Sequence, residues 1–259
     1  MCMLCSCGGG GGGSESQTTT TAQTPIQTST VKTLAADEPN NSAPNNWVGG
    51  LKGIWNPTIP IKGYVIIHQG HSAWSGGNNP EYDLTPMAEA FLNAGYRVYA
   101  FEMPPMPHNY GPVERFYKPV INLLDKIAGD GYPTYMVGFS GGAWTTTNAT
   151  ALDSRIKKGY SIQGDCPLYI WEPKLTEWDE YVSTIYPFFT LYQMAGDRLL
   201  HIYGKKNVGP YGFVDRETAG YPIVYDDTAT THEVTPWAID YILGDINAHS
   251  NSQASANNI

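Results

Sequence analysis

Residues 134–144, Thr-Tyr-Met-Val-Gly-Phe-Ser-Gly-Gly-Ala-Trp, decide how this 259-residue sequence is expected to fold. Their first half is a short apolar run entered through Pro133, which is typical of a buried strand. Small residues follow Ser140 and suit a helix that begins hard against a sheet, although residues 145–147, three threonines, have low helix propensity. We therefore predict a strand, a sharp turn at Ser140 and a helix to about Leu152, with tertiary packing overriding the threonines.

Residues 138–142 also fit the pattern G-x-S-x-G, in which glycines flank a serine at a strand-to-helix turn. A hydroxyl is a poor nucleophile unless it is held exposed beside a base and near donors for the developing oxyanion. A sharp turn provides that exposure, so Ser140 is the candidate nucleophile. The alternative interpretation is a glycine-rich turn without chemistry.

Strand and helix patterns alternate along the rest of the chain. Strands are predicted at 64–67, 96–101, 159–162, 199–203 and 221–225. Helices are predicted from an N-cap at Thr85 to Gly95, from Phe116 to Gly129 with a kink or late start at Pro119, and over Thr235–Leu243. The aromatic-rich residues 167–198 are predicted to be partly helical, as a small cap or as packing helices. This alternation predicts an α/β fold, a mainly parallel sheet with helices on both faces, whose ligands lie beyond the carboxyl ends of the strands.

Composition excludes some classes of function. Only 15% of the residues are charged and the net charge is −9, so nothing neutralises a phosphate backbone and nucleic acid is not an expected partner. No run of about 18 apolar residues occurs, so we expect no membrane-spanning helix.

The beginning of the chain differs in composition from the rest. We divide the sequence into a leader and flexible tether at 1–46, a folded domain at 47–248 and a polar tail at 249–259. Residues 4–8, Leu-Cys-Ser-Cys-Gly, resemble the end of a bacterial lipoprotein signal, in which the cysteine after a small residue is lipidated. The resemblance implies a lipid anchor through Cys7 and a location in the bacterial cell envelope or outside the cell. The alternative is a low-complexity tail of a cytoplasmic protein.

Cysteine and histidine positions do not indicate a metal site or a cofactor. Cys166 is the only cysteine of the folded part, so no internal disulfide is expected. Cys2 and Cys5 have the C-x-x-C spacing but lack two further ligands, and His68 and His71 lack neighbouring carboxylates. We expect neither a metal nor a cofactor.

Three motifs over residues 60–245 together resemble the α/β-hydrolase superfamily: residues 68–71, His-Gln-Gly-His, at the end of a strand; the turn at Ser140; and residues 231–234, Thr-His-Glu-Val, before the last helix. The resemblance implies Ser140 as nucleophile and His232 as base. It also implies oxyanion donors at the Gly141 and His71 N–H groups, with Gly70 allowing close approach. His201, inside a strand, and His68, at a strand end, are expected to be packing residues. His108 lies on a proline-rich loop at the same end of the sheet and either lines the pocket or only belongs to the loop.

The acid of the triad is where the sequence departs from the family. The usual position, after the strand that ends at Gly204, holds an amide, Asn207. An amide can orient a histidine but cannot stabilise an imidazolium as a carboxylate does. The superfamily's alternative place, one strand earlier, holds Asp165, which we favour over Asn207, with Asp215 third. Asp197 precedes its strand and is expected at the wrong end of the sheet.

The resemblance implies a serine hydrolase that cleaves a carboxylic ester through an acyl-enzyme on Ser140, with a small-molecule or polymer ester as substrate. The fold also hosts peptide and thioester cleavage, so a peptidase or a thioesterase is the first alternative. Because Asn207 replaces the usual carboxylate, a tethered, non-catalytic glycan-binding protein is the second.

Overall fold

The computed structural model describes residues 50–70, 74, 82–104, 114–164, 188–204 and 221–256, all within one compact unit, Leu34–Ile259. Within these residues a seven-stranded sheet runs in the order β1-β3-β2-β4-β5-β6-β7. Its strands are β1 (Leu51–Trp55), β2 (Gly63–His68), β3 (Tyr96–Phe101), β4 (Thr134–Phe139), β5 (Ile156–Ile162), β6 (Leu199–Gly204) and β7 (Ile223–Asp226). β1 pairs antiparallel with β3 and the other pairings are parallel, which confirms the predicted α/β class.

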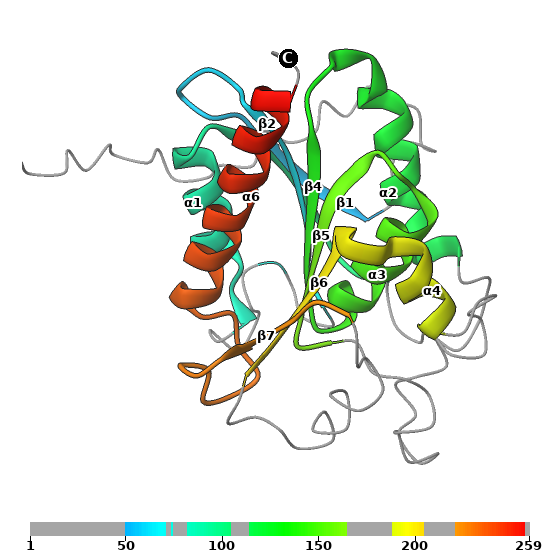
Figure 1. The fold of residues 1–259 in the computed structure, drawn as a ribbon, viewed down its shortest axis with the longest axis vertical. Helices are drawn as coiled ribbons and strands as arrows, with labels where there is room; N and C mark the ends of the chain where they lie inside the picture. The colour runs from blue at the N-terminus through cyan, green and yellow to red at the C-terminus, as the bar shows by residue number, and fades with distance from the viewer. Residues whose placement is uncertain are drawn as a thin grey trace, which may run out of the picture. The chain divides into compact units, whose positions relative to one another are not determined.

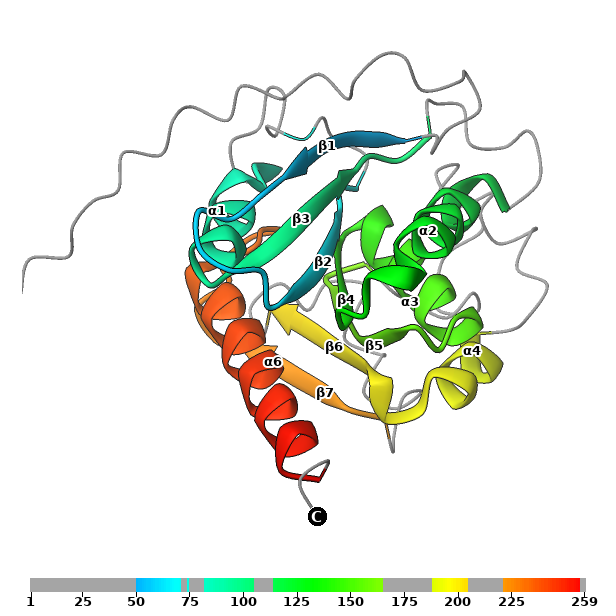
Figure 2. The same cartoon turned by 90° about the horizontal axis from the view of Figure 1, so that it is seen from above.

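Helices cover both faces of the sheet, as predicted. Figures 1 and 2 show α1 and α6 on one face and α2, α3 and α4 on the other. These helices are α1 (Thr85–Asn93), α2 (Glu114–Ile127), α3 (Gly141–Leu152), α4 (Phe188–Ala195) and α6 (Pro236–Ala256), and short 3₁₀ turns follow α2 (η2, Ala128–Asp130) and α4 (η5, Gly196–Arg198). None of the helices in the described ranges is both long and apolar enough to cross a lipid bilayer.

The central strands are buried on both faces. Every residue of β2 and β4 is buried, which explains why both read as continuous apolar runs rather than alternating ones. Odd-numbered β2 residues such as Val65 pack in the core under α1 and α6, and even-numbered ones such as Ile66 pack under α2. Ile242 and Ile246 of α6 pack in the same core as Val65.

Helix α3 is buried along almost its whole length, from Gly141 to Ala151. Two of its threonines bond to the helix itself, because the hydroxyls of Thr145 and Thr146 donate to the carbonyl oxygens of Gly141 and Gly142 one turn earlier, at 3.4 and 2.9 Å. Trp144 packs edge-on against Phe116 of α2, with ring centroids 5.3 Å apart. Packing thus overrides the low helix propensity of the threonines, as the sequence predicted.

Several boundaries differ from the predicted ones. β5 begins three residues earlier, at Ile156, and α6 continues past Leu243 into the polar segment to Ala256. α1 is capped by Leu84, so Thr85 is its first helical residue and not the N-cap; the Thr85 amide instead donates to Asp83 Oδ1. α2 begins at Glu114 and runs through Pro119, so the predicted late start is wrong. Burial of its apolar face, including Phe116 and Val120, offsets the amide donor that Pro119 lacks.

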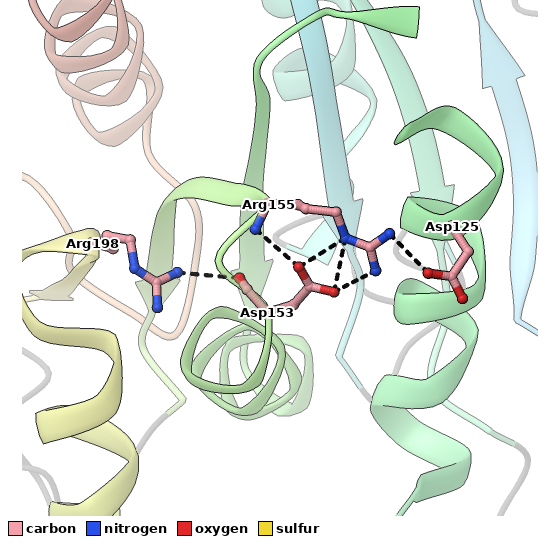
Figure 3. A network of polar contacts seen from close by, with 4 residues as sticks. All are labelled: Asp125, Asp153, Arg155 and Arg198. Carbon is pink, nitrogen blue, oxygen red and sulfur yellow. Dashed lines mark hydrogen bonds and ion pairs between the residues drawn. The ribbon is translucent and has the colours of Figure 1, made fainter. Parts of the chain in front are cut away.

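A charged network ties the amino ends of two strands to neighbouring helices (Figure 3). Arg155, just before β5, forms ion pairs with Asp153 at 2.6 Å and with Asp125 of α2 at 2.8 Å. Arg198, just before β6, donates to the carbonyl oxygens of Asp153 and Ile156. Burial alone would raise the pKa of the Asp153 carboxyl, but the hydrogen bonds from Arg155 outweigh burial and lower that pKa. The network therefore joins α2, α3, β5 and β6 at the end of the sheet opposite Ser140.

Candidate active site

Ser140 lies at the sharp turn between β4 and α3 that the sequence predicted. Its backbone has φ 55° and ψ −123°, a region that non-glycine residues seldom occupy. The two glycines of the pattern touch each other across the turn, since a Cβ on Gly138 would overlap the carbonyl oxygen of Gly142. Side chains at either position would prevent the turn, and this steric demand explains the spacing of the glycines around the serine.

Neighbouring strand ends hold the backbone of this turn. The Ser140 amide donates to the carbonyl oxygen of Ile162 at the end of β5, at 3.0 Å. A Cβ on Gly164 would overlap the Ser140 carbonyl oxygen, and a Cβ on Gly70 would lie 2.7 Å from Ser140 Cβ. The turn is therefore packed between the segments that follow β2 and β5, and both segments meet it with glycine.

The amide side of the turn has the features of an oxyanion site. Gly141 is the first residue of α3, and the first amides of an α-helix have no acceptor within the helix. Gly70 lies beside it, since a Cβ there would be 3.1 Å from the Gly141 nitrogen. The Gln69 side chain fixes this loop, because its Oε1 accepts from the Gly70 amide at 2.8 Å and its Nε2 donates to the Tyr82 carbonyl oxygen. His71, the other predicted donor, lies outside the described residues.

His232 lies beside this turn, on the loop between β7 and α6. Its ring centroid is 4.8 Å from that of Phe139, the residue before Ser140, with the planes tilted by 33°. Tyr82 packs edge-on against the same imidazole at 5.8 Å. The fold thus places His232, which lies after β7, against Phe139, the last residue of β4 and the neighbour of Ser140 in the sequence.

Two carboxylates order the His232 loop, and neither was among the predicted site residues. Asp226, buried at the end of β7, accepts through Oδ1 from the Thr228 amide at 2.8 Å and through Oδ2 from the Thr235 hydroxyl. Glu233 Oε1 accepts from the Thr230 amide at 2.9 Å, and these backbone hydrogen bonds lower the pKa of Glu233. A Thr-x-x-Glu pattern at residues 230–233 resembles a capping box and was the available sequence signal.

His201 and His68 are buried packing residues, as expected. His201 lies within β6 with its ring edge-on to Tyr192 at 4.9 Å, and burial lowers its pKa to about 3. His68 is buried at the end of β2, where Nδ1 donates to the Gln69 carbonyl oxygen at 2.8 Å and the ring stacks on Phe101. His68 also lines a cavity of about 470 Å³ with residues of β3 and α2, and its described lining includes neither Ser140 nor His232.

Other predicted residues lie outside the part of the chain that the structure describes. These are the candidate acids and loop histidines Asp165, Asn207, Asp215, His71 and His108, the predicted anchor Cys7, and residues 167–187 of the aromatic-rich segment. Asp197 is described and lies in η5, before β6, at the amino ends of the strands as expected. Among the described side chains, no three of the metal-binding types gather closely enough to hold an ion.

Comparisons with known proteins support the fold rather than a close relationship. No protein-family model matches the chain, and no curated protein matches its sequence. Est1E from Butyrivibrio proteoclasticus superposes with a TM-score of 0.58 at 13% identity, over 78% of this chain and 93% of that one. The esterase domain of a Rhodothermus marinus protein gives 0.54 at 14% identity, over 76% and 90%. The Pyrococcus furiosus esterase Pf2001 gives 0.51 at 18% identity, over 73% and 83%.

The chain therefore has the α/β-hydrolase fold. This chain superposes over most of the length of the solved esterases, and its described residues form a seven-stranded sheet with helices on both faces. At these identities the likeness establishes architecture alone, because one fold hosts many activities. Any statement about chemistry depends on the residues around Ser140.

Proposed function

We propose that this chain is a serine hydrolase that cleaves carboxylic esters, with Ser140 as the nucleophile and His232 as the general base. One observation carries the proposal: the imidazole of His232 packs against Phe139, next to a serine held in a strained turn at the end of a strand. Residues with strained backbone conformations are found preferentially at active sites and ligand-binding sites. The presence of esterases among proteins of the same fold supports the ester as substrate.

The chemistry would proceed in two stages. Ser140 Oγ attacks the ester carbonyl carbon while His232 accepts the hydroxyl proton, giving a tetrahedral oxyanion. When the C–O bond to the alcohol breaks, His232 returns the proton to the departing oxygen, leaving an acyl ester on Ser140. Water, deprotonated by His232, then attacks this ester and releases the carboxylic acid and the free serine.

Two further roles follow from the same proposal. The N–H of Gly141, with that of His71, would donate to the oxyanion, and each such donor is typically worth roughly 10²- to 10³-fold in kcat. Asp165 would orient His232 and stabilise the imidazolium, with Asn207 as the alternative. Asp165→Asn should then lower kcat by orders of magnitude while Asn207→Ala is mild. The reverse ranking would assign the role to Asn207.

A serine-directed fluorophosphonate probe tests the proposal directly. Wild type should be labelled and Ser140→Ala should not. Ser154→Ala is the matched control, because this exposed serine follows the other end of α3. Labelling of no form of the protein contradicts the proposal, and labelling that persists in Ser140→Ala assigns the nucleophile to another residue.

The choice between ester, thioester and peptide requires a substrate panel. We expect the highest kcat/KM with p-nitrophenyl esters, compared with an acyl thioester and a peptide p-nitroanilide. A hydroxycinnamate ester belongs in the panel because Est1E from Butyrivibrio proteoclasticus has been solved with ferulic acid bound, at a TM-score of 0.54 to this chain. Preference for the thioester or the anilide would establish the thioesterase or peptidase alternative.

The amide at position 207 motivates one candidate from another class, a tethered glycan-binding protein without catalysis. Such a protein would bind soluble polysaccharides in calorimetry and would not react with the fluorophosphonate. Labelling at Ser140 would therefore exclude it.

We also propose that Cys7 is a lipid anchor that holds the enzyme at the bacterial cell envelope. The resemblance of residues 4–8 to a lipoprotein signal supports this. The native gene should encode a basic and then an apolar stretch directly upstream. An in-frame stop codon there would remove the anchor and favour a cytoplasmic protein.

A further inference from the structure

We propose that Gln163 is a positioning residue that fixes His232 relative to Ser140, an inference that rests on the proposed function. Gln163 directly follows β5 and is almost fully buried, with 3% of its surface exposed. Its side chain faces one part of the site and its backbone neighbours face another. The contacts of the side chain and those of the backbone of residues 162–164 involve different atoms.

The backbone on either side of Gln163 contacts the serine turn. The Ile162 carbonyl oxygen accepts the hydrogen bond from the Ser140 amide, and Gly164 packs against the Ser140 carbonyl oxygen. The Gln163 amide donates to the Ile202 carbonyl oxygen of β6 at 2.9 Å, which anchors the segment to the next strand. Residues 162–164 are therefore fixed relative to the nucleophile.

The side chain of Gln163 contacts the histidine loop. Its Nε2 donates to the Glu233 carbonyl oxygen at 2.8 Å and makes a longer contact of 3.5 Å to that of Thr231. These two carbonyl groups belong to the residues immediately before and after His232. One carboxamide thus grips the backbone on both sides of the proposed base.

Backbone conformation points to the same pair of positions. Over the described ranges, Ser140 and Gln163 are the two non-glycine residues with positive φ, at 55° and 50°. A positive φ at a non-glycine residue costs free energy and persists where surrounding contacts require it. At Gln163 the strained conformation is the one in which the side chain reaches the His232 loop while residues 162 and 164 stay on the serine turn.

The expected effect is on the rate of proton transfer and not on substrate binding. His232 works as a base only when its imidazole lies within hydrogen-bond reach of the Ser140 hydroxyl. Asp226 and Glu233 order the loop internally, whereas Gln163 ties that loop to the segment that holds the serine. Loss of the tie should misplace the imidazole, and a displacement near 1 Å can cost roughly 100-fold in rate.

Gln163→Met tests the inference, because methionine matches the length of glutamine without the amide donor. Gln193→Met, the same change at an exposed position of α4, is the matched control. The measurements are the second-order rate constant of fluorophosphonate labelling and the separate kcat and KM for p-nitrophenyl acetate. The labelling rate constant is taken from the time course, so it does not depend on how much of the protein is folded.

We expect Gln163→Met to lower the labelling rate constant and kcat by roughly 10- to 100-fold with KM nearly unchanged, while Gln193→Met matches wild type. If Gln163→Met does not fold, Gln163→Asn decides, because asparagine tolerates positive φ and keeps the amide but is one methylene too short. Wild-type labelling rates in the folded variant overturn the positioning role and leave the proposed function intact. Absence of labelling in wild type overturns the proposed function and this inference with it.

Discussion

The two ends of the parallel sheet are held by different kinds of interaction. At the amino ends of β5 and β6, the carboxylates of Asp125 and Asp153 face the guanidinium of Arg155 (Figure 3). At the carboxyl ends, the carboxylates of Asp226 and Glu233 accept hydrogen bonds from neutral amides and hydroxyls of their own loop.

We infer that the interactions at the amino ends stabilise the fold, whereas those at the carboxyl ends set the geometry of the candidate site. Opposite charges at the amino ends join elements to one another, and removing one of them should weaken the fold and leave Ser140 in place. At the carboxyl ends the contacts include hydrogen bonds to backbone groups, and the two non-glycine residues with positive φ in the described ranges, Ser140 and Gln163, lie there. Changes there should alter the geometry of the site more than the free energy of unfolding, which four variants can test.

The largest effect is expected from His232→Ala. Loss of the proposed base should lower kcat by about 10³-fold or more with little change in Tm, since the imidazole is only half-buried. Steady-state kinetics and thermal melts measure the two quantities, with His249→Ala on α6 as control. A small loss of activity together with a large loss of Tm would assign His232 to the structural side of the comparison.

Gly164→Ala should act on both quantities, and more strongly on activity. A methyl group there overlaps the Ser140 carbonyl oxygen, so the turn must shift. We expect kcat to fall by about 10²-fold and the free energy of unfolding to fall by about 1–3 kcal/mol. Gly244→Ala in α6 is the matched control, because a Cβ there meets nothing within 4 Å. An active Gly164→Ala enzyme would contradict the close packing at the carboxyl ends.

Asp153→Asn should show the opposite profile, with kcat unchanged and the free energy of unfolding lowered by about 1–3 kcal/mol. This range lies between the free-energy contributions typical of exposed and of buried ion pairs. It suits Asp153, whose side chain is 11% exposed, beside Arg155, whose side chain is 36% exposed. Chemical denaturation measures the effect.

The same variant should also change the pH dependence of stability. The pKa of Asp153 is lowered in the folded protein, so its contribution is complete above the ordinary carboxyl pKa and is lost as pH falls through the lowered one. The difference between wild type and Asp153→Asn should therefore shrink below about pH 4. A difference that grows on acidification would contradict the ionic origin.

The smallest effect is expected from Lys52→Ala. Its ion pair with Glu102 is 2.8 Å long, but the lysine side chain is 51% exposed. Exposed pairs contribute about 0–1 kcal/mol, so Tm and kcat should hardly change. A loss of stability as large as that of Asp153→Asn would mean that the charged network at the amino ends stabilises the fold no more than an exposed ion pair does.

The core of the fold was predictable from local sequence patterns. Strands β2 and β4 are nearly continuous apolar runs, β3 is apolar apart from Arg97, and the turn at Ser140 follows from the glycine spacing. The antiparallel edge strand β1 was not predicted, because its burial alternates weakly and a bulge interrupts its register near Gly53. The full length of α6 was missed because its last turns are polar.

The proposed nucleophile and base could be predicted from the sequence, but the residues that hold them in place could not. Ser140 and His232 follow from motifs of a few residues each. The contact of Gln163 with the carbonyl groups of Thr231 and Glu233 spans about 70 residues of sequence and depends on a backbone conformation that no local pattern encodes. Asp226 resembles any strand-terminal carboxylate until its four acceptor contacts are seen.

Burial of α3 has a further consequence for how the protein loses activity. Its amides beyond the first turn are enclosed by the sheet and by α2 and α4, so they should exchange with solvent only when the whole domain opens. Ser140 is the N-cap of that helix, so we expect it to lose its position only when the helix unfolds with the rest of the domain. Heat should therefore inactivate and unfold the molecule in one step, and an assay of residual activity would serve as a direct count of folded molecules.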